Sequence, residues 1–394
     1  MATRHPNICP FAYLHIRTSA YLHICKSISM RLLVCSILVL CGLTAGAQTD
    51  TALARQKREA AIALIDDGKS TEALVMLAAA QQLDPNDPEI PYEIAFAHYQ
   101  LQDYEGAIAI LKKMIKNKMA TARVYQMLGN SYDNAGKSSK AIETYDKGLE
   151  HFPAAGNLYL ERGVMELNTK QYNKALAFFE SGIKADPAFP SNYYWAARLF
   201  FDSEEEVWAM IYGEIFVNLE RGSKRTEEIS KQLYYTYKSE IKFKDDTSIT
   251  VSFSKNNTVN IVYNPKSGPD ALLQALMRKP FGTGVYEPTL ALAVAGEKIV
   301  SLTTLNNIRS RFLDNYQQLG HQQKTPVVLF DYQQQVRSAG HFEAYNYWVL
   351  GNGNQQEFDD WRLNNPQKWQ QFITWFTNHP LQVTEENKFY RSKY

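Results

Sequence analysis

The chain has 394 residues, with 42 lysines and arginines against 41 aspartates and glutamates, so its formal net charge is +1. A charge this close to zero gives no general attraction to nucleic acid or to an anionic membrane surface, and we expect neither as a partner. All four cysteines (Cys9, Cys25, Cys35 and Cys41) lie near the start of the chain. The rest therefore offers no thiol for a disulfide, a zinc–thiolate site or a cysteine nucleophile.

Residues 1–47 have the pattern of an export signal. Arg31 precedes an apolar run over Leu32–Leu43 that is too short to span a bilayer, and Ala45-Gly46-Ala47 follows as a small-x-small cleavage site. We expect cleavage after Ala47, and Met30 is a more natural start than Met1. Without this leader the chain has 38 basic and 41 acidic residues, and no second apolar run is long enough to cross a membrane. The sequence predicts an exported protein, periplasmic or at the cell surface.

A period of 34 residues follows the leader. Small residues recur at this spacing in two registers, as close packing of paired helices requires. The first register is Ala61, Ala95, Gly129, Gly163 and Ala197, and the second is Ala73, Ala107, Ala141, Ala175 and Ala209. Four residues after the second register come the larger Leu77, Leu111, Tyr145 and Phe179. Pro85, Pro153 and Pro187 are expected to stop the second helix of their repeats.

This length and pattern resemble the tetratricopeptide repeat, a helix–turn–helix unit that stacks into a solenoid. The resemblance implies an all-α superhelix, an α-solenoid of about five helix pairs, over residues 48–223. Residues 224–239 are expected to form the capping helix, with Ile229, Leu233 and Tyr237 on one face. The overall plan is similar to secreted repeat proteins of Bacteroidota-type bacteria.

Residues 240–394 are predicted to form a smaller α+β domain, for which no family is recognised and whose role is unknown. Apolar and polar residues alternate, as in an antiparallel sheet, over Ile241–Phe243, Ile249–Phe253 and Val259–Tyr263. Helices are expected at Pro269–Arg278, Ile308–Leu319, Phe342–Leu350 and Asn365–Asn378, while Leu290–Ile299 fits either a helix or a strand. Phe281–Gly284 is expected to be a loop rather than a phosphate cradle.

No catalytic signature occurs in the sequence, so we predict no enzyme activity, no catalytic residue, no cofactor and no metal. The alternative is a hydrolase or small-ligand-binding domain at residues 240–394, presented by the repeats. A cluster of His321, His341 or His379 with Asp359 or Asp360 would favour it.

Two aromatic helix faces near the end of the chain are expected to pack together as a core. They consist of Phe342, Tyr345 and Trp348, and of Trp369, Phe372, Ile373 and Phe376. An exposed platform for stacking carbohydrate or peptide is the sharper alternative.

In the family that the repeats resemble, ligands bind in a concave groove lined by the first helix of each repeat. The resemblance places Tyr92, Phe96, Tyr99, Arg123, Gln126, Asn130, Leu160, Val164, Tyr194 and Arg198 in that groove. Rings supply contact area, amides satisfy a peptide backbone and arginine pairs with a carboxylate. Asn130 matches the asparagine of the family's carboxylate clamps, but the paired lysines of those clamps are missing.

We therefore expect a non-catalytic scaffold of the cell envelope that holds a protein or peptide partner in the repeat groove. Two alternatives remain open at this point. The inner face is merely solvated, or it is filled by the chain's own second domain.

Overall fold

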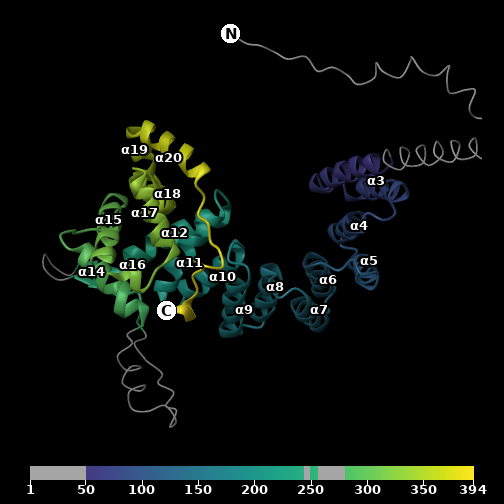
Figure 1. The fold of residues 1–394 in the computed structure, drawn as a ribbon, viewed down its shortest axis with the longest axis horizontal. Coiled ribbons are helices and arrows are strands. Elements are labelled where there is room, and N and C mark those ends of the chain that lie inside the picture. The colour runs from purple at the N-terminus through teal and green to yellow at the C-terminus, as the bar shows by residue number, and fades with distance from the viewer. Residues whose placement is uncertain (1–49, 244–248, 256–279) are drawn as a thin grey trace, which may run out of the picture. The chain divides into compact units, whose positions relative to one another are not determined.

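The computed structural model describes residues 50–243, 249–255 and 280–394 (Figure 1). They belong to two compact units that divide between Met114 and Ile115, and each unit is described by itself. The leader, the predicted strand Val259–Tyr263 and the predicted helix Pro269–Arg278 lie outside the described residues.

The first unit is helical throughout its described part. Residues 50–66 form a helix, followed by α3 (Ser70–Leu83), α4 (Glu89–Gln100) and most of α5 (Tyr104–Lys116). Ala61, Ala73 and Leu77 are fully buried in its core. These are the positions at which the 34-residue period predicts small and large residues between paired helices.

The second unit begins with helices that follow the same period. They are α6 (Ala122–Asn134), α7 (Ser138–His151), α8 (Gly156–Asn168), α9 (Tyr172–Ala185), α10 (Pro190–Phe201) and α11 (Glu206–Leu219). Each first helix packs on its second, α6 on α7, α8 on α9 and α10 on α11. The predicted stops are confirmed, because α3, α7 and α9 each end two residues before their proline.

Two glycines show why the first register needs small residues. A Cβ atom at Gly129 would lie 2.1 Å from the Tyr145 ring, and one at Gly163 would lie 2.3 Å from the Phe179 ring. Both rings are essentially fully buried. The large residue of the second helix therefore occupies the space that the glycine of the first helix leaves open.

Helix α11 lies at the centre of the second unit. Every residue from Val207 to Asn218 is buried, which is typical of a helix covered on all sides. On one side lies α12 (Lys224–Glu240), the predicted capping helix, and its face of Ile229, Leu233 and Tyr237 is buried as expected. The hydrophobic core nevertheless continues beyond α12, from Ala175 to Phe389.

The predicted α+β character of residues 240–394 is confirmed only weakly. Strands β1 (Ile241–Phe243) and β2 (Ile249–Val251) pair antiparallel, with Ile241 opposite Val251. The other described elements are helices: α14 (Glu287–Val294), α15 (Leu302–Gln318), α16 (His321–Lys324), α17 (Val328–Ser338), α18 (Phe342–Leu350), α19 (Gln355–Asn364) and α20 (Pro366–Asn378). The ambiguous segment from Leu290 is thus helical at its start.

Residues Gly282–Tyr286 form a π-helical turn, so the prediction of a loop at Phe281–Gly284 was wrong. Glycine is needed at position 282 because the backbone there approaches the side chain of Ser254 closely, and not because it gives the chain flexibility. A Cβ atom on it would lie 2.0 Å from the hydroxyl oxygen of Ser254.

The two aromatic faces near the end of the chain pack together, as predicted. Ring centroids are 4.6 Å apart for Trp348 and Phe376, and 6.5 Å apart for Tyr345 and Phe372. Tyr345 and Phe372 are fully buried. These rings form a core and not an exposed stacking platform.

Candidate functional site

A row of polar side chains joins α6 to α8, the first helices of the third and fourth repeats. Gln126 donates from Nε2 to Oε1 of Glu161 (2.8 Å) and accepts at Oε1 from Nδ2 of Asn157 (2.7 Å). All three side chains are half-buried. Burial raises the pKa of Glu161, and hydrogen bonds from Gln126 and Asn130 partly oppose that effect.

Asn130 lies in the same row, and a core residue holds its side-chain amide by a hydrogen bond. Its Oδ1 accepts a hydrogen bond of 2.5 Å from the hydroxyl of Tyr145, which lies in the core on α7. The core tyrosine therefore fixes the orientation of the asparagine amide. Glu161 was not among the sequence-predicted site residues. It lies 35 residues after Gln126, one more than the repeat period, and this spacing could have indicated the contact.

A second polar group joins α10 to α12. Tyr194 donates from its hydroxyl to Oε2 of Glu228 (2.9 Å) and accepts from Arg198 Nη1 (3.2 Å). The Arg198 guanidinium also lies over the Trp195 ring, 5.4 Å from its centroid. The Tyr194 ring itself is only 5% exposed and packs on Phe216, so it offers a ligand only its hydroxyl end.

The remaining predicted site residues of the second unit are Arg123, Leu160 and Val164. Arg123 is a half-buried residue of α6. Leu160 and Val164 are partly buried and pack against the core from α8. We call the side chains that α6, α8, α10 and α12 contribute here the helix-A face: Arg123, Gln126, Asn130, Asn157, Leu160, Glu161, Val164, Tyr194, Arg198 and Glu228.

Tyr92, Phe96 and Tyr99 lie on α4 in the first unit and are described apart from the helix-A face. All three are half-buried. Phe96 packs against the core of that unit, and the Tyr99 ring contacts the Tyr104 ring edge-on at 5.5 Å.

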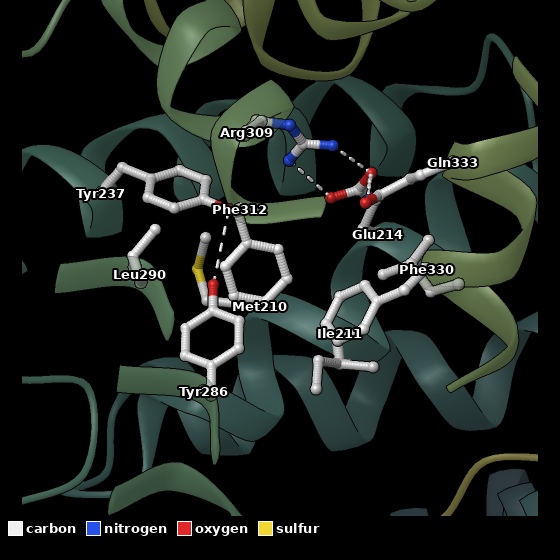
Figure 2. Close-up of a pocket in the computed structure, with 11 residues that line it drawn as sticks. Met210, Ile211, Glu214, Tyr237, Tyr286, Leu290, Arg309, Phe312, Phe330 and Gln333 are labelled. Atoms are coloured by element: carbon white, nitrogen blue, oxygen red, sulfur yellow. Dashed lines mark hydrogen bonds and ion pairs between the residues drawn. The ribbon is translucent and has the colours of Figure 1, made fainter. Parts of the chain in front are cut away.

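A buried polar centre lies elsewhere in the second unit, around Glu214 of α11 (Figure 2). Arg309 of α15 donates two hydrogen bonds to its carboxylate (2.8 and 2.5 Å), and Gln333 of α17 donates to the same group (2.7 Å). Tyr345 of α18 also donates to this carboxylate (2.8 Å). The Glu214 and Arg309 side chains are 3% and 4% exposed. Burial lowers the pKa of Arg309, but the nearby Glu214 carboxylate outweighs that effect and raises the pKa above its usual value.

The cavity beside this centre is too small for a substrate. Its volume is about 10 Å³, and Tyr237 and Tyr286 close it with hydroxyls 3.4 Å apart (Figure 2). Such a space holds about one water molecule. The centre therefore ties α11, α15, α17 and α18 together and does not form an active site.

The three histidines do not assemble a metal site. His341 and His379 both lie against the Trp375 ring, at 5.5 and 4.5 Å between centroids, whereas His321 packs on Tyr316. Among the residues that the structure describes, no group of three histidine, cysteine or acidic side chains is arranged to hold a metal.

In the described ranges, no helix has both the length and the hydropathy that crossing a bilayer demands.

Two segments match family models described as tetratricopeptide repeat, residues 64–131 and residues 127–190. The Hsp70-Hsp90 organizing protein of Triticum aestivum is 25% identical over 111 residues, 28% of this chain and 19% of that protein. Tetratricopeptide repeat protein 21B of Mus musculus is 25% identical over 118 residues, 30% of this chain and 9% of that protein. The matches thus span less than a fifth of the length of these relatives.

Similar solved structures include that of Pseudomonas aeruginosa pilF. It is 17% identical, with a TM-score of 0.40, and the match covers 48% of this chain and 86% of that chain. A thermophilic TPR protein from Thermus thermophilus has 17% identity and a TM-score of 0.39, and covers 46% of this chain and 98% of its own. From the matched segments and the helix pairs that they contain, residues 64–190 of this chain are tetratricopeptide repeats.

Proposed function

We propose that the chain is a non-catalytic scaffold of the bacterial cell envelope that binds an extended segment of a partner protein on the helix-A face. The observation that carries the proposal is the row of oriented amides formed by Gln126, Asn130 and Asn157. A primary amide has two N–H donors and an oxygen with two lone pairs, so each retains capacity to bond a peptide backbone. Two segments of the chain match tetratricopeptide-repeat models, and one relative is named as an Hsp70-Hsp90 organizing protein, which supports a protein-binding role.

The chemistry of the helix-A face suits a peptide better than a small molecule. Leu160 and Val164 are partly buried and offer apolar contact. The Arg198 guanidinium faces Glu228 at 3.5 Å and is 45% exposed, so it offers further donors for a carboxylate. The Glu161 carboxylate offers an acceptor for backbone N–H groups. An extended chain presents donors, acceptors and side chains at regular intervals, which matches a surface of this mixed character.

The test is affinity capture from the cells that make the protein, with variants that avoid the core. Gln126→Ala with Arg198→Ala removes one amide and one guanidinium of the helix-A face. Lys147→Ala is the matched control, because Lys147 is exposed on α7 and forms its ion pair with Glu143 of the same helix. A partner that the wild type and the control retain and the double variant loses supports the proposal. A partner that the double variant holds as strongly contradicts it.

Export is part of the proposal and rests on the leader pattern of residues 31–47. The amino terminus of the protein recovered from its cells should then be Gln48. Recovery with the leader still attached would contradict cleavage at this site. The alternative of a C-terminal hydrolase has no supporting cluster among the described residues.

A further inference from the structure

The last residues of the chain contact α9 and α11, which contribute no residue to the helix-A face. The C-terminal segment, residues 384–394, runs along α9 and α11, the second helices of the fourth and fifth repeats (Figure 1, yellow). Lys388 donates from Nζ to the backbone carbonyl of Lys184 (2.6 Å), and the Lys184 ammonium lies over the Tyr390 ring. Tyr390 is extended, and Arg391–Lys393 form a short 3₁₀ turn directly after it.

Arg391 makes the most specific contact of this segment. Its guanidinium donates from Nε and Nη2 to the two oxygens of Glu180 (3.1 and 3.0 Å). Its backbone N–H donates to the hydroxyl of Tyr212 (2.8 Å), and that hydroxyl donates to Glu180 (2.9 Å). Glu180 is 8% exposed and Tyr212 is fully buried. One arginine is thus recognised through both its side chain and its backbone.

Phe389 supplies the apolar anchor of the same segment. Its side chain is fully buried, with its ring 5.6 Å from Tyr212 and 6.0 Å from Trp208, both on α11. Phe281 extends the aromatic wall, since its ring stacks on Trp208 at 5.6 Å. We call Glu180, Trp208, Tyr212 and Phe281 the segment seat. An aromatic pocket beside a buried carboxylate is the arrangement expected of a peptide-binding hot spot.

We propose that the segment seat is a second peptide-recognition site, selective for an aromatic residue followed two positions later by arginine, and that the C-terminal segment occupies it in cis. The ligand chemistry is read from the occupant itself, Phe389-Tyr390-Arg391. The proposal does not depend on the helix-A face, because the two sets of residues do not overlap.

The ion pair of the C-terminal segment is accessible to solvent, whereas its Phe389 anchor is fully buried. The Arg391 side chain is 43% exposed, and a cavity of about 560 Å³ adjoins it, lined also by Tyr172, Phe200 and Glu204. Solvent and salt therefore reach the ion pair, and salt screens exposed charges. A tethered segment meets its site at an effective concentration of about millimolar, so the cis segment competes strongly with any peptide added in trans.

The test uses a labelled synthetic peptide of residues 384–394 as the probe and fluorescence anisotropy as the readout. A chain truncated after Val383 should bind this peptide at least about tenfold more tightly than the full chain, in which the seat is filled. A peptide with Phe389→Ala should bind about a hundredfold more weakly, because the buried ring is the main anchor. A peptide with Arg391→Ala should also weaken. The matched control is Lys393→Ala, since Lys393 contacts only the segment's own Lys388 and Tyr394.

A second comparison covers the case in which the truncated chain fails to fold. The full chain with Phe389→Ala keeps its length but loosens the cis segment, and it should bind the wild-type peptide more tightly than the wild-type chain does. Equal affinity of these two full chains would overturn the proposal. So would a folded truncated chain that binds the wild-type and Phe389→Ala peptides equally well.

Discussion

Glu214 and Arg309 form an ion pair with almost no access to water, and this fixes what a single substitution should do. Glu214→Gln leaves the Arg309 charge buried without its partner, and we expect a loss of about 3–5 kcal/mol in the free energy of unfolding. Urea unfolding followed by circular dichroism measures it. Glu143→Gln is the control, because that carboxylate is exposed on α7 and its loss should leave the free energy of unfolding essentially unchanged. A loss below about 1 kcal/mol at Glu214 would show that the centre is hydrated or neutral.

Glu206, at the start of α11, gives the fold a pH dependence of unusual sign. Burial first, and then the negative charge of Glu240, raise the pKa of Glu206 to about 7, while Lys255 opposes the shift. Between the unfolded pKa of 4.5 and this value, the folded state holds the proton more tightly than the unfolded state. Stability contributed by the protonated group is therefore present at low pH and falls as the pH rises through 7.

We accordingly expect Glu206→Gln to abolish this fall in folding stability with rising pH. The gain in unfolding free energy over the wild type should be about 1–2 kcal/mol larger at pH 8 than at pH 5, after allowance for solvent screening. Chemical unfolding at both pH values measures the difference. An equal effect of the substitution at both values would mean that Glu206 titrates normally. Glu297→Gln serves as a comparison at another half-buried carboxylate, which is paired with Arg311.

The sequence indicates the contacts of some individual residues and not those of others. Glu214 stands in the apolar run Val207–Val217, which marks it as a buried charge in need of a partner. The partner lies 95 residues further along the chain, and no local pattern links the two. The contact of Glu161 differs from that of Glu214, because the repeat period indicates it. Glu161 lies one residue after the position that is equivalent to Gln126 in the next repeat.

Helix pairing follows directly from the repeat registers, which makes it testable at one glycine. Gly163→Ala places a methyl group against Phe179 of α9, where the space is already filled. We expect a loss of about 1–3 kcal/mol in unfolding stability. Phe179→Leu should recover part of this loss in the double variant, since the smaller side chain gives way. A Gly163→Ala variant as stable as the wild type would contradict the tight crossing of α8 and α9.

The elements that repeat were predictable from the sequence, and those that do not repeat were less so. Small residues at fixed offsets mark the paired helices, and Pro85, Pro153 and Pro187 mark where three of the second helices end. Helices α16, α17 and α19 carry no such marks and were missed, although Val328, Tyr332 and Val336 of α17 are buried at helical spacing. The turn at Gly282 was missed because two nearby glycines suggest a loop. Only the contact with Ser254 shows that the glycine serves packing.

On the scale of the whole second unit, the predicted boundary at residue 240 separates helices that share one core. The Glu214 carboxylate of α11 is held by Arg309, Gln333 and Tyr345, all from beyond that boundary. Trp208 and Tyr212 of α11 likewise pack on Phe281 and Phe389. The repeats of this unit therefore depend on the later helices to cover their last helix.

We predict that a fragment of residues 115–240 does not fold cooperatively, whereas residues 115–394 unfold in one transition. Cutting at residue 240 exposes several large side chains of α11, at about 1.5–3 kcal/mol each. Together these losses approach the whole stability of a domain, about 5–15 kcal/mol. Thermal unfolding of both fragments, with dye binding to exposed apolar surface, makes the comparison. A cooperative transition with full helicity in the shorter fragment would support the predicted domain boundary at residue 240, and the later helices would then be an addition to a complete solenoid.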